Sequence, residues 1–391
     1  MATTALTSNF SCREGEVAQR VLDGPAKTSA HFLRGDELPL HVLRTGHLAG
    51  KVLWFLRVSE VANAMAVQRA MEFPCRAVLG AQRPVLHVLG GHDGRSLSSH
   101  CWRMDPSTGN WQEVAPLPSA RSMATAAAVG GRLYVVGGFD GDFLANMEVF
   151  DPAWNEWSPG PPMSQRRGGL GLVALRGHLF ACGGRDGDIY HSSAECFQLP
   201  EAAEPSDGRW HPLPALLRPR CYPAAVRFAE GVWLCGGLTR SSNGTGGYLA
   251  STECLALDAT SWCRGPQLLG PRASAVAAEL RIGLVVCGGC AKEGPFDTAE
   301  VLASSSSPSF QALPKLHGFR NLPAAAMVMS PSCAPGDFFR QRLLIFGGFS
   351  GKKHLKTVEA FNEETCSWEL VGDLPEPILA AAATAVCMPL S

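Results

Sequence analysis

The side chains best suited to chemistry in this 391-residue chain are arginines that recur at a fixed distance from glycine pairs. Four of them lie 16 residues before the first glycine of a Gly-Gly pair, and a fifth lies 27 residues before one because of an insertion around residues 330–339. Guanidinium groups bind carboxylates and phosphates through paired hydrogen bonds. If they converge in space, they form a receptor for an acidic partner. The five are Arg121, Arg167, Arg220, Arg272 and Arg320.

The polar loops that follow the glycine pairs carry a second group of candidate binding residues. Three of these loops contain Asp-Gly, in the sequences HDG at 92–94, FDG at 139–141 and RDG at 185–187. The loops differ from one another as binding loops do, although aspartate and glycine also suit plain turns. The candidate partner-binding residues are Asp93, Asp140, Arg185, Asp186 and Tyr190.

An internal repeat must position these residues. Six apolar runs end in a glycine pair, and the first glycines are separated by steps of 47, 46, 53, 52 and 59 residues. Each pair is followed by a polar loop, a short strand-like run, a tight turn, an aromatic residue and a Pro-rich stretch, which predicts four short strands per unit. The first glycines are Gly90, Gly137, Gly183, Gly236, Gly288 and Gly347, and the aromatic residues are Trp111, Trp157, Trp210, Trp262, Phe310 and Trp368.

With a glycine pair ending the second strand, a glutamate in the third and a tryptophan in the fourth, each unit resembles a kelch repeat. The resemblance covers residues 84–388 and implies an all-β fold, a six-bladed kelch β-propeller of four-stranded blades around a central channel. Glycine pairs and tryptophans then serve packing between blades. The apolar run at 376–388 follows the last repeat without a glycine pair. We expect it to supply the innermost strand of the first blade and close the ring.

The resemblance leaves two roles open for the arginines, which should lie at the start of each innermost strand, near the channel mouth. Kelch propellers that recruit degradation targets use such arginines, with the loops, to hold acidic peptides. Alternatively, the arginine is part of the kelch consensus and ties adjacent blades through backbone carbonyls. In the first blade Ile378 falls at this position, and Arg76 is near enough in the sequence to substitute.

The first 80 residues are expected to form a separate segment. Residues 1–35 are polar and unpatterned, and we expect them to be disordered. Residues 36–80 have apolar side chains at spacings of three and four, which predicts short helices. Part of this segment resembles an F-box, which binds the adaptor of an SCF-type ubiquitin ligase, although the opening Leu38-Pro39 comes too early; a helical cap on the propeller is the alternative. The adaptor-binding candidates are Leu53, Phe55, Leu56, Val61 and Val67.

Composition argues against a nucleic-acid or membrane partner. The chain has 34 Lys+Arg and 35 Asp+Glu, so its formal net charge of -1 gives no global attraction to polyanions. No apolar run reaches the roughly 18–20 residues of a spanning helix, and no secretory signal is readable. The 14 cysteines are scattered, several within apolar runs. We therefore expect a cytoplasmic protein, with the nucleus as the alternative, and reduced thiols.

An enzyme is the remaining alternative, since kelch propellers also include a copper-radical oxidase and metal-dependent specifier proteins. Four tyrosines and eleven histidines without paired metal spacing argue against both. Cys287 and Cys290 form a C-x-x-C, but it falls on the repeat's own glycine pair. We expect no cofactor, no metal and no catalysis. The expected function is recognition of a protein partner, as the substrate-recognition subunit of an SCF-type ligase or as a scaffold or cytoskeletal-binding protein.

Overall fold

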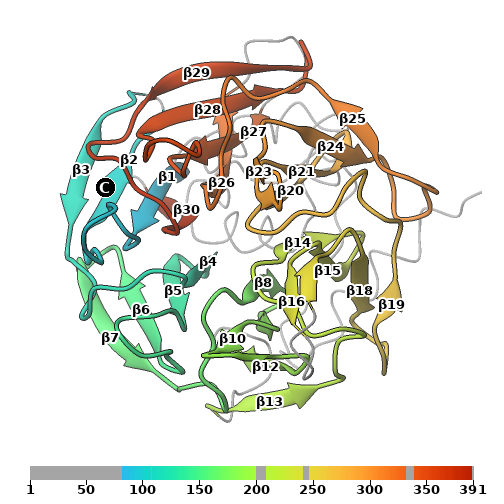
Figure 1. Ribbon diagram of the computed structural model, residues 1–391. Helices are drawn as coiled ribbons and strands as arrows, with labels where there is room; N and C mark the ends of the chain where they lie inside the picture. Colours follow the sequence, from blue (N-terminus) through green and yellow to red (C-terminus); the bar gives the residue numbers. More distant parts are fainter. Residues whose placement is uncertain (1–81, 107, 200–207, 241–245, 332–338, 390–391) are drawn as a thin grey trace, which may run out of the picture. The chain divides into compact units, whose positions relative to one another are not determined.

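Short apolar runs bounded by glycine pairs and proline-rich stretches form the strands of this chain. The computed structural model describes residues 82–106, 108–199, 208–240, 246–331 and 339–389. They form six four-stranded antiparallel sheets arranged in a ring (Figure 1). This confirms the all-β, six-bladed propeller. The expected disordered segment 1–35 and the expected helical segment 36–80 lie outside the described residues.

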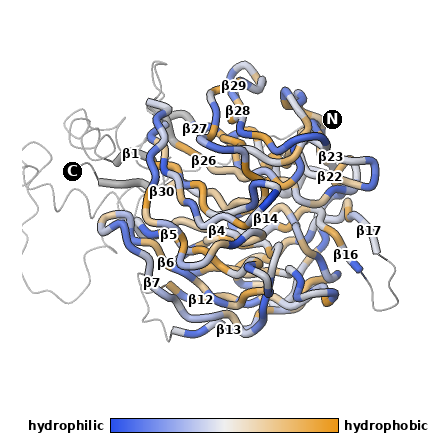
Figure 2. Tube along the Cα trace, turned by 60° about the vertical axis from the view of Figure 1, so that its left-hand side comes forward, coloured by the Kyte–Doolittle hydropathy of each residue, from blue (hydrophilic) through white to orange (hydrophobic). Residues whose placement is uncertain are grey.

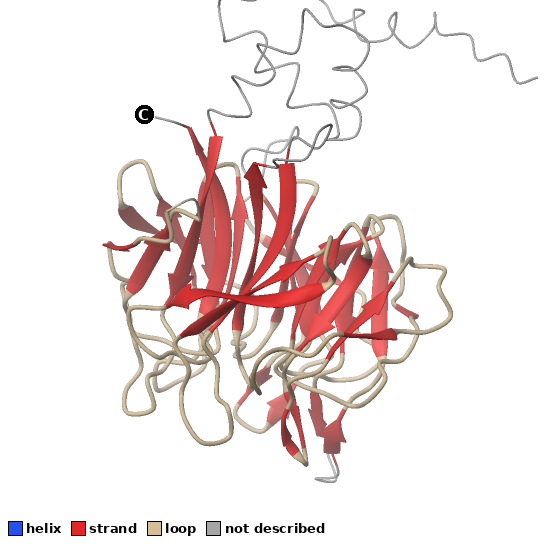
Figure 3. Ribbon diagram, turned by 90° about the horizontal axis from the view of Figure 1, so that it is seen from above, coloured by secondary structure: helices blue, strands red, loops and turns tan. Residues whose placement is uncertain are grey.

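Each blade runs from an innermost strand to an outermost strand, and the described residues contain strands and connecting loops (Figure 3). Blade 1 is β30 (Ala382–Pro389), β1 (Gln82–Leu89), β2 (Cys101–Met104) and β3 (Trp111–Val114), and blade 2 is β4 (Thr125–Val129), β5 (Arg132–Val136), β6 (Met147–Asp151) and β7 (Glu156–Gly160). Blade 3 is β8 (Gly171–Leu175), β9 (His178–Cys182), β12 (Ala194–Gln198) and β13 (Trp210–Leu213), and blade 4 is β14 (Ala224–Phe228), β15 (Gly231–Cys235), β18 (Thr252–Ala256) and β19 (Cys263–Arg264). Blade 5 is β20 (Val276–Leu280), β21 (Gly283–Cys287), β24 (Ala299–Leu302) and β25 (Gln311–Leu313), and blade 6 is β26 (Ala324–Pro331), β27 (Phe339–Phe346), β28 (Thr357–Asn362) and β29 (Ser367–Asp373).

The hydrophobic core lies between the blades. Among the described residues, one apolar cluster joins each pair of neighbouring blades, including a cluster that joins blade 6 to blade 1. Between blades 2 and 3, for example, Tyr134 and Val136 of β5 share a cluster with Leu179 and Ala181 of β9. The strands are accordingly apolar along much of the interior of the ring (Figure 2). Each blade thus buries its faces against two neighbours, which a single blade cannot do alone.

The ring is joined at blade 1 by strands from opposite ends of the propeller sequence. β30 pairs antiparallel with β1 over eight residues of register, from Gln82↔Pro389 to Leu89↔Ala382. β30 also contacts β26 of blade 6 and β4 of blade 2. The innermost position of the first blade is therefore filled by the last strand of the chain.

Aromatic side chains in or next to the outermost strands join blades to the ones before them. In four blades the indole Nε1–H donates a hydrogen bond to a backbone carbonyl of the preceding proline-rich stretch, which adds a directional contact to the apolar packing. These bonds are Trp157 to Ala115 at 2.8 Å, Trp210 to Pro161 at 2.9 Å, Trp262 to Pro214 at 2.9 Å and Trp368 to Pro314 at 3.0 Å.

The glycine pairs are required because the backbone of the next blade approaches them closely. Gly137 has φ of 64°, and a Cβ there would clash with the backbone carbonyl of Arg167. Its neighbour Gly138 has φ of 109° and donates its N–H to the same carbonyl at 2.9 Å. The pair therefore combines left-handed backbone with a hydrogen bond between blades.

Candidate functional site: the loop face and channel mouth

The repeated arginines lie inside the blades. In blade 3, Arg167 is fully buried, and its Nη1 donates to the carbonyls of Gly183 at 2.7 Å and Ser193 at 2.9 Å. Its Nε donates to Oε1 of Glu195 at 3.1 Å. Both glycine and glutamate belong to the same blade as the arginine. The guanidinium therefore pins the second and third strands of its own blade.

The same arrangement recurs in five blades. Each arginine is at most 5% exposed and pairs with the glutamate of the third strand. Burial lowers the pKa of Arg121, Arg167 and Arg220 from the ordinary value, although the partner carboxylates oppose this shift. The pairs are Arg121–Glu148, Arg167–Glu195, Arg220–Glu253, Arg272–Glu300 and Arg320–Glu359.

This burial corrects the expectation that the five guanidiniums converge on an open channel mouth. Their hydrogen bonds go to backbone carbonyls, to a glutamate of their own blade and to neighbouring polar side chains, which leaves little surface for a partner. The arrangement favours a structural role for these arginines, but it differs from the expected one in how adjacent blades are joined. Adjacent blades are tied by the arginine's backbone carbonyl, which accepts the N–H of the preceding glycine pair, rather than by its side chain.

The glutamates were missed as partners of the arginines, although the sequence contains the signal. In five repeats a glutamate follows the glycine pair, in the third strand, and the same five repeats contain the arginine. Opposite charges that recur together in an apolar repeat indicate a buried pair, because an unpaired buried charge is costly.

The loops after the glycine pairs all lie at one end of the ring, together with the stretches that lead from each outermost strand to the next innermost strand. We call this end the loop face. Three of its loops form small hairpins, namely β10–β11 (Arg185–Asp186 and Ile189–Tyr190), β16–β17 (Leu238–Arg240 and Gly246–Tyr248) and β22–β23 (Cys290–Ala291 and Gly294–Pro295).

Two of the predicted loop residues have turn roles. Asp93 is exposed, and its Oδ1 accepts the N–H groups of Ser96 and Arg95 at 2.7 Å each, which lowers the pKa of this carboxyl. Asp140 is also exposed and accepts the N–H of Asp142 at 3.3 Å. Both carboxylates shape their loops, as turn chemistry predicts.

The other three predicted loop residues lie together on blade 3. Arg185 pairs with Tyr190 across the β10–β11 hairpin, and the Arg185 guanidinium lies over the ring of Phe143 from blade 2, 5.2 Å from its centroid. Asp186 pairs with Arg166, with an Nε–Oδ2 distance of 3.3 Å. The structure thus brings Arg185, Asp186 and Tyr190 together but places Asp93 and Asp140 on other blades.

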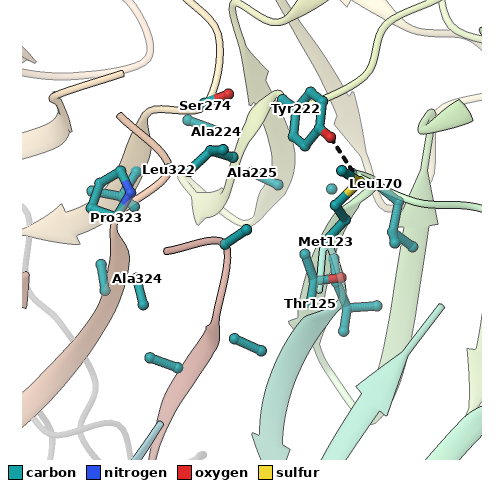
Figure 4. A pocket seen from close by; sticks show the side chains of 18 of the residues that line it. Met123, Thr125, Leu170, Tyr222, Ala224, Ala225, Ser274, Leu322, Pro323 and Ala324 are labelled. Atoms are coloured by element: carbon teal, nitrogen blue, oxygen red, sulfur yellow. Dashed lines mark hydrogen bonds between the residues drawn. The ribbon is translucent and has the colours of Figure 1, made fainter. Parts of the chain in front are cut away.

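A ring of six residues in left-handed backbone conformation lines the channel mouth, and Figure 4 labels four of them, Met123, Tyr222, Ser274 and Leu322. Each lies two residues after the arginine position, and the ring residues are joined by backbone hydrogen bonds, such as Gly169 N–H to Met123 O at 2.9 Å and Tyr222 N–H to Gly169 O at 2.6 Å. Non-glycine residues adopt this conformation at a cost, so the surrounding blades must hold it. The ring is Met123, Gly169, Tyr222, Ser274, Leu322 and Ala380.

Tyr222 lies along this ring instead of pointing out of it. A Cβ on Gly169 would clash with the Tyr222 aromatic ring, and the Tyr222 hydroxyl donates to Sδ of Met123 at 2.9 Å (Figure 4). Burial raises the pKa of Tyr222 to about 12. The channel beneath has a volume of about 210 Å³, and half of the residues that line it are alanines in or just before the innermost strands.

The C-x-x-C cysteines do not form a site. Cys287 is fully buried, and burial raises its pKa to about 12, while Cys290 is half-buried and also has a raised pKa. Both are free thiols. Within the described ranges, no group of three or more His, Cys, Asp or Glu residues is arranged to hold a metal ion. The same residues contain no helix long and apolar enough to cross a membrane.

The adaptor-binding candidates Leu53, Phe55, Leu56, Val61 and Val67 all lie outside the described residues.

Comparison with known proteins gives the family of the repeats. The model of the Kelch motif matches residues 75–118, 120–164, 166–217 and 332–375. Similar curated proteins include Kelch-like protein 35 of Mus musculus, 32% identical over 93 residues, which are 24% of this chain and 16% of that protein. Kelch-like protein 33 of Homo sapiens is 42% identical over 60 residues, 15% of this chain and 11% of that protein. The chain therefore matches only a small part of the length of these relatives.

Among solved structures, that of YjhT is similar in fold. It has a TM-score of 0.57 and 15% sequence identity, and the match covers 73% of this chain and 97% of that one. At this identity the likeness concerns the fold alone.

Proposed function

Because the chain is a kelch-repeat β-propeller protein, we propose that it is a non-enzymatic interaction module whose loop face binds a protein partner. One observation carries this proposal. The repeated charges are held in buried pairs that build the ring, whereas the loops of the loop face differ from blade to blade and present half-buried aromatic and cationic side chains. Non-repeating side chains on a rigid scaffold are typical of a recognition surface.

Arg185 is the centre of the proposed surface. Its half-buried guanidinium stacks on Phe143 beside Tyr190. A stacked, partly exposed guanidinium at a loop tip suits a carboxylate of an acidic peptide. The proposed partner is therefore a protein that presents an acidic segment.

We further propose that residues 36–80 act as an F-box-like segment, which would make the chain a substrate-recognition subunit of an SCF-type ubiquitin ligase. This part of the proposal rests on the sequence resemblance at Leu53, Phe55 and Leu56. A scaffold without a ligase link is the alternative. A cytoplasmic or nuclear location belongs to the same proposal. Ten cysteines of the described part are free thiols, which is consistent with a reducing compartment.

Affinity purification from cells tests both parts. The intact chain is compared with a chain lacking residues 1–80 and with the double variant Arg185→Ala/Tyr190→Ala. Trp154→Ala is the matched control, since Trp154 is 77% exposed in the turn between β6 and β7, at the end of the blade opposite the loop face.

We expect the double variant to lose a partner that the control retains, and the shortened chain to keep this partner but lose the ligase adaptor. Equal recovery of all partners by the double variant and the intact chain would contradict binding at the loop face. Absence of an adaptor from the intact chain would leave the scaffold alternative.

A further inference from the structure

Blade 1 differs from the other five blades at both positions of the buried ion pair. Ile378 occupies the arginine position, because its carbonyl accepts the N–H of Gly348 at 2.8 Å just as the Arg167 carbonyl accepts that of Gly138. Trp102 occupies the glutamate position, because it pairs with Val88 as Glu148 pairs with Val135. The arginine and glutamate have thus been replaced together, which avoids an unpaired buried charge.

The acceptors that surround the guanidinium in other blades have counterparts in blade 1. In blade 3, Nη2 of Arg167 donates to Gln165 at 3.3 Å and to the Ser193 hydroxyl at 2.8 Å. Glu376 stands in the place of Gln165, two residues before the arginine position. His100 stands in the place of Ser193, because the backbone carbonyl of each accepts the N–H of the first glycine of its own blade's pair, Gly90 and Gly183 respectively.

These counterparts line a cavity of about 140 Å³ that the structure places on the loop face of blade 1. The cavity is bounded by Asp93, Ser98, His100, Glu376 and Ile378, among others. Oε1 of Glu376 lies 3.0 Å from Nδ1 of His100 and 3.4 Å from Nε1 of Trp102, which fixes the carboxylate at the cavity wall. The Glu376 side chain remains 36% exposed and so is accessible from solvent.

Asp93 adds a second carboxylate to the cavity. Its pKa lies below the ordinary value because two backbone N–H groups bond to it, so it is ionised at neutral pH. Two carboxylates at a cavity that carries no arginine of the repeat favour a cation. Because carboxylates are planar and accept paired hydrogen bonds, they suit a guanidinium better than a compact ammonium group.

We propose that the blade 1 cavity is a subsite for an arginine side chain of a protein partner, which takes the place that the repeat's own arginine fills in the other five blades. The partner's guanidinium donates to Glu376 and lies beside Asp93 and Ser98. The identity of the ligand as part of a protein rests on the proposed function of the loop face. The preference of the subsite for a guanidinium is independent of that proposed function, so it can be tested with a small molecule.

The experiment measures saturation-transfer NMR from the intact 391-residue chain to L-argininamide. L-Citrullinamide, which has nearly the same shape and the same α-amino group but lacks the side-chain charge, is the matched ligand. We expect transfer to argininamide well above that to citrullinamide. Glu376→Gln removes the charge with little change in shape and should weaken argininamide binding roughly tenfold, the loss of one charge-assisted hydrogen bond. Glu156→Gln, at an exposed position of β7, should have no effect.

Ile378→Arg provides a second test, because it supplies the missing guanidinium within the chain and should abolish argininamide binding. Equal transfer to the two ligands, or unchanged binding by the Glu376→Gln variant, would overturn the proposal even if Ile378→Arg fails to fold. Stronger binding after Arg76→Ala would also overturn it, since an arginine of the chain itself would then occupy the cavity. Argininamide binding without any partner at the loop face would support the subsite and contradict the proposed function.

Discussion

At the residue scale, the buried arginine–glutamate pairs depend on a third group, the backbone N–H three residues before the arginine. In blade 3 this is the N–H of Ser164, which donates to Oε2 of Glu195 at 2.8 Å. In blade 2 the same position is Pro118, which has no N–H. Glu148 instead accepts from the side chain of Asn146 at 3.1 Å. A single proline thus changes how one blade satisfies the same carboxylate.

Removal of one partner of such a pair should be severely destabilising. In Glu195→Ala, Arg167 keeps its charge while buried without a carboxylate, and we expect a loss of about 3–5 kcal/mol in the free energy of unfolding. Urea denaturation followed by tryptophan fluorescence measures it. Arg185→Ala, a change at a half-buried residue of the loop face, should cost less than about 1 kcal/mol. A similar small cost for Glu195→Ala would show that the pair does not hold the blade.

His87 gives the propeller a defined sensitivity to acid. It is 1% exposed, and burial lowers its pKa from 6.5 to about 4; the backbone of Val85 opposes this shift and Arg103 adds slightly to it. Between these two pH values the unfolded chain binds a proton that the folded chain does not. Stability should therefore fall by about 3 kcal/mol as the pH drops from about 6.5 to 4.

The variant His87→Phe isolates this effect, because Phe180 occupies the same position of blade 3. We expect the free energy of unfolding of the variant to fall less than that of the parent chain between pH 7 and pH 4. Parallel pH profiles for the two proteins would contradict the assignment.

At the scale of the elements, blade 1 is the unusual unit of the ring. Its second strand β1 carries His87, its third strand β2 carries Trp102 in place of glutamate, and the segment before β30 carries Ile378 in place of arginine. The other blades pin their second and third strands with a guanidinium, whereas blade 1 relies on apolar packing and on the eight-residue pairing of β1 with β30. Closure of the ring and loss of the ion pair thus occur in the same blade.

The two replacements in blade 1 should be energetically coupled. Ile378→Arg places a charge at a buried apolar position and Trp102→Glu places one at a half-buried position, so each alone should destabilise the propeller. Together they rebuild the ion pair, and a double-mutant cycle should give a favourable coupling energy of about 1–3 kcal/mol. Recovery should be incomplete because Pro375, like Pro118, has no N–H for the second carboxylate oxygen. Strict additivity in the cycle would contradict the equivalence of these positions.

At the scale of the whole molecule, stability depends on closure. Each interface between blades contains one apolar cluster, and β30 takes part in the interfaces on both sides of blade 1. Loss of this strand would expose β1 and remove contacts to β26 and β4 at once. A closed ring has no terminal repeat to act as a cap, in contrast to an open solenoid.

Truncation before residue 376 should therefore unfold the propeller globally. We expect the shortened chain to lose its cooperative thermal transition and to show rapid amide exchange in all six blades, not only in blade 1. The matched control is a chain that ends at Pro389 and so lacks only the last two residues. Native-like protection of blades 3 to 5 in the truncated chain would contradict closure as the source of stability.

The sequence by itself determined the repeat, because glycine pairs and aromatic residues recur six times in the same order, and its resemblance to kelch repeats implied the number of blades and the four strands of each. It did not determine which arginines are accessible, since that depends on what the neighbouring strands place around each side chain. Arg167 and Arg185 are both arginines near a glycine pair, yet one is fully buried against Glu195 and the other is half-buried over Phe143. Tertiary structure also decided that replacing Arg and Glu by Ile378 and Trp102 leaves a cavity with Glu376 at its wall. Periodicity is a local property of the chain, whereas burial and charge pairing arise only when residues distant in sequence are packed together.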